Sequence, residues 1–185
     1  MEMLTGDFDN FNVSRFMSTN PPSDNSFDTM QEIKELVKMP SNKRFVKEKD
    51  DIESYFKKVA ERSGIDFYPE FIAEDLIEKS APIIMKLKNH YDRPRPKVLA
   101  KQMGIKLNDI EMDSMKTPSY PSGHSVQGIL IGNVLATIFP LSALEFIKAG
   151  KDISYSRNIA RTHYKSDSKF GEAIGLELYK HLKQK

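Results

Sequence analysis

Apolar residues recur at helical spacing along most of the chain, starting at residue 26. The first such stretch ends before Pro40 and has its apolar positions at Met30, Ile33, Leu36 and Val37. Because side chains three and four residues apart share one helix face, this spacing predicts an amphipathic helix. Residues 1–25 have no periodic pattern and are rich in Asn, Asp, Ser, Thr and Pro. We interpret them as a polar arm that is either loose or laid over the surface.

Gly and Pro residues divide the remaining apolar pattern into shorter segments. Ser80 followed by Pro82 is typical of a helix start. Two further prolines exclude a helix across residues 93–96, and residues 99–119 suggest a short helix and a long polar loop. Helices are predicted at about residues 47–62, 69–77, 80–91, 124–139, 141–150, 152–166 and 169–183.

The pattern indicates an all-α protein. No run of alternating apolar and polar residues stands out, and the sequence has no internal repeat. A chain of 185 residues is long enough to bury one core and short for two domains. We expect residues 26–185 to form a single helical domain, preceded by the arm of residues 1–25.

Composition argues against several kinds of partner. The chain has 28 basic and 26 acidic residues, a formal charge of +2, so no overall field favours nucleic acid. Residues 128–147 are the longest apolar run, but Asn133, Pro140 and Glu145 interrupt it, which favours a buried core helix over a membrane span. Cysteine is absent, which excludes disulfides and thiolate metal sites. The N-terminus lacks the apolar region of a secretory signal, so we expect a cytoplasmic protein.

Residues suited to chemistry are concentrated in three segments, of which the richest is Ser154–Asp167. We expect this segment to be one helix, on which His163 and Asp167, four residues apart, share a face. A carboxylate at that position orients the imidazole and stabilises its charged form. Arg157 is within reach of the same face, and a nucleophile held by a third group beside a cation suits chemistry on an anion. Taken alone, a solvated helix with an ion pair is the simpler interpretation.

The other two segments supply cations and a proton donor. Lys88 closes a predicted helix and Arg95 follows in the extended turn, so both can converge on one anion. In the next segment Gly123 permits close approach of the backbone, Ser122 offers a hydroxyl, and His124 can act as a general acid. The simpler alternatives are cations at a helix C-terminus, and a serine N-cap beside an incidental histidine.

The order and spacing of these segments resemble the three-part signature of the type 2 phosphatidic acid phosphatase and vanadium haloperoxidase superfamily. The matching residues are Lys88-x6-Arg95-Pro96, Pro121-Ser122-Gly123-His124 and Ser156-Arg157-x5-His163-x3-Asp167. Within the superfamily, residues 21–178 look most like the soluble class A bacterial non-specific acid phosphatases, which share the runs Lys-x-x-Tyr-x-Arg-x-Arg-Pro and Ser-Tyr-Pro-Ser-Gly-His. Two features depart from that class: Lys97 stands where it has an aromatic residue, and its members carry an export signal to the periplasm.

The resemblance implies a helical bundle of the acid phosphatase and vanadium haloperoxidase type. It also implies a metal-independent acid phosphatase that hydrolyses phosphomonoesters through a phosphohistidine intermediate. His163 would be the nucleophile, oriented by Asp167, and His124 the general acid and base. The phosphate-binding residues would be Lys88, Arg95, Ser122, Gly123 and Arg157. No metal or cofactor is implied, vanadate is expected to bind as a phosphate mimic, and the expected partners are a small phosphorylated substrate and a second copy in a homo-oligomer, a dimer.

Three alternatives remain open at this point. A vanadate-dependent haloperoxidase would bind vanadate in the same pocket, although the haloperoxidases of the superfamily are much larger. A membrane lipid phosphatase would need several apolar spans of ~20 residues, which the sequence lacks. A non-catalytic phosphate-binding module would not need the His163–Asp167 pair or His124. Outside the motifs, we interpret His90 and His181 as surface residues and Tyr91 as a packing residue.

Overall fold

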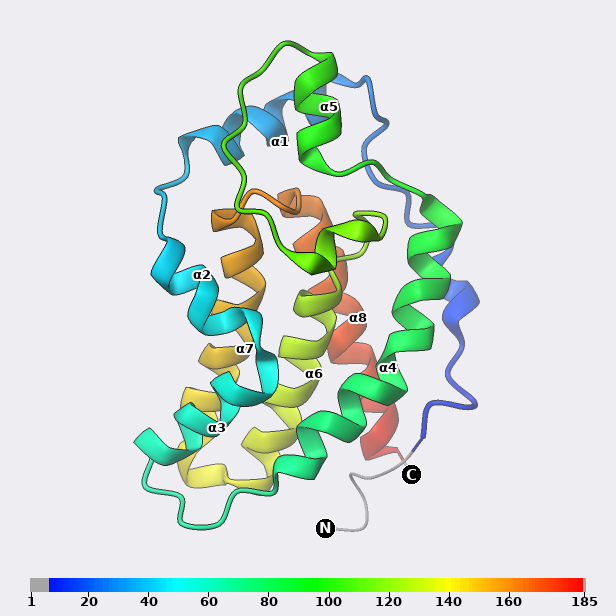
Figure 1. Ribbon diagram of the computed structural model, residues 1–185. Helices are drawn as coiled ribbons and strands as arrows, with labels where there is room; N and C mark the ends of the chain where they lie inside the picture. Colours follow the sequence, from blue (N-terminus) through cyan, green and yellow to red (C-terminus); the bar gives the residue numbers. More distant parts are fainter. Residues whose placement is uncertain (1–6, 185) are drawn as a thin grey trace.

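The computed structural model describes residues 7–184 and contains no strand within that range (Figure 1). The α-helices are α1 (Phe27–Lys38), α2 (Lys43–Asp50), α3 (Ile52–Arg62), α4 (Glu70–Tyr91), α5 (Pro96–Gln102), α6 (Gly123–Ile138), α7 (Ala143–Ile159) and α8 (Lys165–Lys183). Three short 3-10 helices join them, at η2 (Val13–Phe16), η3 (Asp113–Lys116) and η4 (Pro140–Ser142). The expected all-α fold is confirmed.

Helix α6 lies at the centre of the bundle, between α7 and α8 (Figure 1). The helices can pack this closely because glycines face each other where they cross. A Cβ added to Gly150 of α7 would lie 2.3 Å from the carbonyl oxygen of Gly128 in α6, a separation that no side chain tolerates. A Cβ added to Gly175 of α8 would lie 2.4 Å from the carbonyl oxygen of Val126. A Cβ added to Gly171, near the start of α8, would lie 2.6 Å from the carbonyl oxygen of Ser122, so close packing also fixes the N-terminus of α6 against this part of α8.

Two predicted helix boundaries in the first half of the chain are wrong. The helix expected over residues 47–62 is broken at Asp51, whose carboxylate accepts the Ser54 N–H at 3.0 Å and so caps α3. The break expected before Ser80 does not occur, because α4 continues through Pro82 and bends along its length (Figure 1). Buried apolar residues lie on both sides of the proline, so tertiary packing outweighs the local preference for a new helix start.

The described part of the N-terminal arm lies over α4 and α8, while residues 1–6 are outside the described range. Phe8 and Phe11 are buried, and the ring of Phe11 meets that of His181 edge to face at 5.6 Å. Tyr91 donates its hydroxyl proton to the Phe16 carbonyl, which agrees with a packing role. The interpretation of His181 as an ordinary surface residue is wrong, since its Nε2 is buried beneath the arm without a hydrogen-bond partner.

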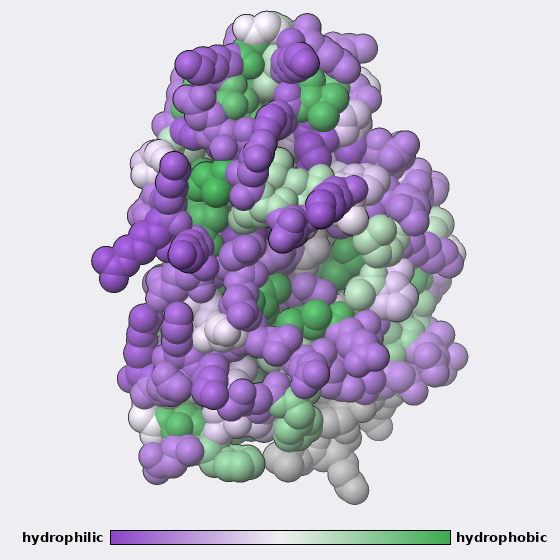
Figure 2. Space-filling model, in the orientation of Figure 1, coloured by the Kyte–Doolittle hydropathy of each residue, from purple (hydrophilic) through white to green (hydrophobic). Residues whose placement is uncertain are grey.

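Hydrophilic side chains cover most of the face seen in Figure 2, with smaller apolar areas between them. Among the described helices, none is both long enough and apolar enough to cross a lipid bilayer.

Candidate active site

The three motif segments meet at the N-terminal end of α6, around a cavity of about 250 Å³. Its lining residues are Ala81, Ile84, Met85, Lys88, Arg95, Ser114, Thr117, Gly123, His124, Gln127 and His163. Five of the eight predicted site residues are therefore on its wall: Lys88, Arg95, Gly123, His124 and His163. The other three, Ser122, Arg157 and Asp167, are buried next to residues of that wall.

His163 does not lie on a helix, which corrects the expectation of one helix over 152–166. Helix α7 runs unbroken from Ala143 to Ile159, and the chain then reverses through Arg161, which has a left-handed φ of 59°. Arg161 is held in that conformation by backbone carbonyls, donating to Leu36 O at 2.9 Å and Met39 O at 2.9 Å. The turn moves His163 into the connection between α7 and α8, where its ring reaches the cavity.

The contact between His163 and Asp167 exists nevertheless, for a different reason from the one expected. Asp167 lies in the first turn of α8, and its carboxylate accepts the backbone N–H of Tyr164 at 3.0 Å. This capping interaction aims the carboxylate back at the residue before the helix. His163 Nδ1 therefore lies 3.1 Å from Asp167 Oδ2.

Hydrogen bonding assigns the tautomer of His163. Arg95 Nη1 lies 2.9 Å from His163 Nε2, and because a guanidinium only donates, Nε2 must be the acceptor. The ring proton is then on Nδ1, where it is donated to Asp167. Burial, followed by the charge of Arg95, holds the pKa of His163 well below its usual value. His163 is thus a neutral imidazole with a lone pair on the nitrogen beside the cavity cations.

Asp167 is completely buried and has more partners than His163 alone. Arg93 Nη1 donates to its Oδ1 at 2.7 Å, and the Ser119 hydroxyl donates to its Oδ2. Burial raises the pKa of Asp167 to about 6, and the charge of Arg93 and the hydrogen bond from Ser119 act in the opposite direction. Arg93 was not among the predicted site residues. The signal available for it was its place in the Lys-x-x-Tyr-x-Arg-x-Arg-Pro run.

The two cations of the first segment are held in place by carbonyl groups. Arg95 donates through Nε to Thr117 O at 2.8 Å and through Nη2 to Ser114 O at 2.8 Å. Lys88 donates to Pro118 O, and burial together with the charge of Arg95 lowers the pKa of Lys88 to about 7. These carbonyls are neutral, so they orient the cations without cancelling their charge.

The third cation, Arg157, has a carboxylate partner that sequence analysis missed. Arg157 Nη1 donates to Asp50 Oδ1 at 2.8 Å, and the same oxygen is 3.5 Å from His124 Nε2. The His124 Nε2 is also 2.9 Å from the backbone oxygen of Asp50. Burial and then the charge of Arg157 lower the pKa of His124 to about 4, whereas Asp50 acts to raise it. Asp50 belongs to no motif, and it reaches the site because α2 ends there.

Ser122 matches the simpler of its two interpretations. Its side-chain oxygen is the N-cap of α6, accepting the Ser125 N–H at 3.2 Å, and the Ser125 hydroxyl lies 2.9 Å away. Ser122 is fully buried and is not part of the cavity wall, whereas Gly123, the first residue of α6, is. A phosphate contact from Ser122 stays a prediction.

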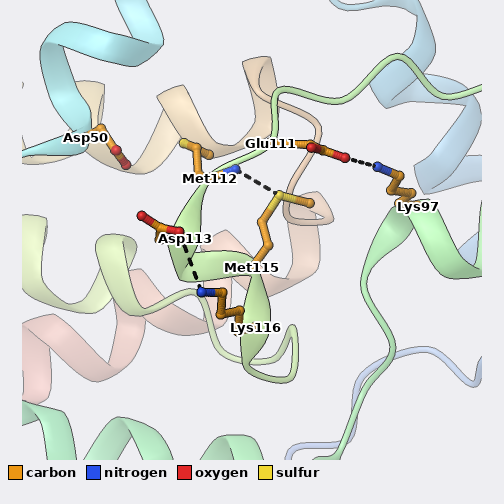
Figure 3. A pocket seen from close by; sticks show the side chains of 7 residues that line it. All are labelled: Asp50, Lys97, Glu111, Met112, Asp113, Met115 and Lys116. Carbon is orange, nitrogen blue, oxygen red and sulfur yellow. Dashed lines mark hydrogen bonds and ion pairs between the residues drawn. The ribbon is translucent and has the colours of Figure 1, made fainter.

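A second, larger hollow of about 550 Å³ lies beside Asp50, under the loop that carries η3 (Figure 3). Four of its charged residues form two ion pairs: Lys97 is 2.7 Å from Glu111, and Lys116 is 3.6 Å from Asp113. Figure 3 shows both pairs along its wall. Because these cations are already neutralised by carboxylates, the smaller cavity is the better anion site. Among the described residues, no group of His, Cys, Asp and Glu side chains is arranged to hold a metal ion.

Comparison with known proteins finds similarity in the region of the chain that contains the three motif segments. Residues 77–182, more than half of the chain, match the model of the PAP2 superfamily. A non-specific acid phosphatase of Salmonella typhimurium is 36% identical over 88 residues, and one of Salmonella typhi is 35% identical over 88 residues. The matched segment covers 48% of this chain and only 35% of each Salmonella protein.

The fold is similar to that of a solved structure. A transmembrane PAP2 type phosphatidylglycerolphosphate phosphatase from Bacillus subtilis superposes with a TM-score of 0.60, over 93% of this chain and 90% of that one. The sequence identity is 16%, so this likeness concerns the fold alone.

Proposed function

The chain belongs to the PAP2 superfamily, and on that premise we propose that it is a metal-independent acid phosphatase that hydrolyses phosphomonoesters through a phosphohistidine intermediate. The observation that carries the proposal is the state of His163. Its Nδ1–H is anchored on Asp167, and its Nε2 lone pair lies beside Arg95 at the cavity wall. An oriented neutral imidazole next to fixed cations is suited to attack a phosphoryl group.

In the first step, Nε2 of His163 attacks phosphorus in line with the ester oxygen. The P–N bond forms as the P–O ester bond breaks, and His124 gives its proton to the departing alkoxide. The imidazole becomes positively charged, and Asp167 stabilises that charge through Nδ1. Lys88, Arg95 and Arg157 neutralise the charge on the equatorial phosphoryl oxygens.

In the second step, His124 removes a proton from a water molecule, which attacks the phosphohistidine. The P–N bond breaks, inorganic phosphate leaves, and His163 regains its lone pair on Nε2. The same residue thus serves as acid and then as base. The pKa of His124 lies below its usual value, but a bound phosphate dianion next to the ring acts to raise it and so favours the protonated acid.

The size and lining of the cavity are consistent with a small substrate. Its wall also contains the apolar side chains Ala81, Ile84 and Met85 of α4, which can contact the organic part of a phosphomonoester. The homo-oligomer implied by the resemblance to class A acid phosphatases stays a prediction, for which light scattering of the purified protein is the measurement.

The proposal is tested with nitrophenyl phosphate. We expect hydrolysis to persist in a strong chelator and to be inhibited by vanadate, because the site neutralises phosphate with Lys88, Arg95 and Arg157 rather than with metal ions. Loss of activity in chelator that a divalent cation restores would contradict metal independence. Absence of hydrolysis across a panel of phosphomonoesters would contradict the function itself.

A further inference from the structure

Arg93 is a buried cation that does not line the cavity. It lies in the extended connection between α4 and α5, and its side chain is 1% exposed. One amino group, Nη1, donates to Asp167 Oδ1 at 2.7 Å and to Ser166 Oγ at 2.8 Å. The other, Nη2, donates to Glu32 Oε2 at 3.1 Å. The guanidinium also stacks 3.7 Å from the ring centre of Tyr164.

Glu32 holds this arrangement from the side of α1. Its Oε1 accepts the backbone N–H of Ser166 at 2.7 Å, and its Oε2 accepts the Ser166 hydroxyl at 2.8 Å. One carboxylate therefore binds both Arg93 and the first turn of α8, in which Asp167 lies. As a result, the distance between the guanidinium and Asp167 is set by α1 as well as by the two residues themselves.

The two carboxylate oxygens of Asp167 accept hydrogen bonds from different donors. Oδ1 accepts from Arg93, and Oδ2 accepts from His163 Nδ1, from Ser119 and from the Tyr164 backbone. Removal of one partner from a buried ion pair leaves the other charge uncompensated, and a carboxylate in that position takes up a proton. A protonated Asp167 cannot stabilise a cationic phosphohistidine.

We propose that Arg93, held by Glu32, is a positioning residue that keeps the Asp167 carboxylate ionised and oriented so that His163 presents Nε2 to the substrate. The inference rests on the proposed function, since it concerns the nucleophile of that reaction. Other charges also act on Asp167: those of Lys88 from α4 and of Arg95 are favourable but come from the cavity side without a hydrogen bond to it. Arg93 is the cation that contacts the carboxylate directly.

The first measurement is the pH dependence of kcat/KM for nitrophenyl phosphate. In Arg93→Met the pKa of Asp167 rises, so the carboxylate ionises only at higher pH and the acidic limb of the profile moves upward by at least one unit. Near pH 6 we expect kcat to fall by ~10–100-fold, by analogy with the loss of hydrogen-bond partners behind metal ligands, with little change in KM. Arg93→Lys retains a charge near Asp167 and should recover part of the shift. Unchanged acidic limbs in both variants would overturn the proposal.

The second measurement needs no activity. The ¹³C chemical shift of a carboxyl group reports its protonation state, so the titration of Asp167 can be followed in the labelled protein. In Arg93→Met the midpoint of that titration should move to higher pH than in the wild-type protein. An unchanged midpoint would overturn the proposal even if the protein hydrolysed no phosphomonoester. Conversely, failure of hydrolysis with the shifted midpoint intact would count against the function alone.

Two further variants separate positioning from stability. Glu32→Gln removes the charge that holds Arg93 but leaves Arg93 in place, so it should fold readily and shift the acidic limb by less than Arg93→Met. Arg15→Met is the matched control, because Arg15 also pairs with a glutamate, Glu177, and lies over an aromatic ring, that of Phe16, but is outside the site. It should leave the acidic limb in place. An equal limb shift in Arg15→Met and Glu32→Gln would reduce Arg93 to a structural role.

Discussion

The two sides of the cavity are built differently. On the side of the proposed nucleophile, His163 and Arg93 are buried, and each is hydrogen-bonded to the buried Asp167, at 3.1 Å and 2.7 Å respectively. On the acid side, His124 and Arg157 contact Asp50, whose side chain is 45% exposed. Under the proposed function, attack on phosphorus requires one fixed direction, so the nucleophile benefits from full preorganisation. The leaving group would vary from one phosphomonoester to the next, and a more open acid side would accommodate that variation.

The cations on the two sides of the cavity also differ in their partners. Arg95 is held by neutral carbonyls and one imidazole nitrogen, so its charge remains available to a phosphate. Arg157 is paired with the carboxylate of Asp50. A phosphate that binds Arg157 must therefore compete with a side chain of the protein itself. The comparison predicts that substitutions on the nucleophile side affect every substrate, whereas those on the acid side depend on the substrate and on pH.

The largest effect is expected from His163→Ala. This change removes the nucleophile, so no phosphoenzyme forms and turnover should vanish for good and poor leaving groups alike. The measurement is acid quench of the enzyme with phosphorus-labelled substrate. A labelled phosphoenzyme trapped in His163→Ala would show that another residue is the nucleophile and would remove the basis for distinguishing the two sides.

His124→Ala should have an intermediate effect that depends on the leaving group. For an alkyl or sugar phosphate, loss of the proton donor should slow the first step by ~10²–10⁴-fold. For nitrophenyl phosphate, whose leaving group needs little protonation, phosphohistidine should still form. It should also accumulate, because the same residue is needed to activate water. Equal slowing of phosphoenzyme formation for both substrate types would contradict the role of His124 as the acid.

Asp50→Asn should have the smallest effect, in two separable parts. Release of Arg157 from an exposed carboxylate should lower KM by roughly two- to five-fold, the range set by a partly exposed ion pair of ~0.5–1 kcal/mol. Asp50 also raises the pKa of His124, so its removal should lower that pKa and move the alkaline limb of the pH profile to lower pH.

The control for this substitution is Asp113→Asn, which neutralises an exposed carboxylate of the larger hollow paired only with Lys116. It should change neither KM nor the alkaline limb. An alkaline limb that stays in place in Asp50→Asn would mean that Asp50 does not influence the pKa of His124. The contrast between the two sides of the cavity would then lose its support.

Local patterns were informative where the structure depends on neighbours in sequence. Helical spacing predicted the all-α class, and motif spacing identified five residues that line one cavity. The same reasoning was wrong at Asp51, at Pro82 and at His163. At Asp51 a side-chain cap starts a new helix, at Pro82 packing maintains α4, and near His163 backbone contacts to Arg161 turn the chain. In the last two cases contacts made by tertiary structure outweighed local preference.

The chemical groups of the site could be identified from the sequence, because a motif records residue types and their spacing along the chain. The surroundings of these groups depend on contacts between distant parts of the chain. Asp50 meets Arg157 across 107 residues and Glu32 meets Arg93 across 61, and neither pair leaves a periodic signal. The tautomer of His163 likewise follows from Arg95, 68 residues away. Spacing reports which residues are close along a helix, whereas charge, burial and protonation depend on what the fold packs against them.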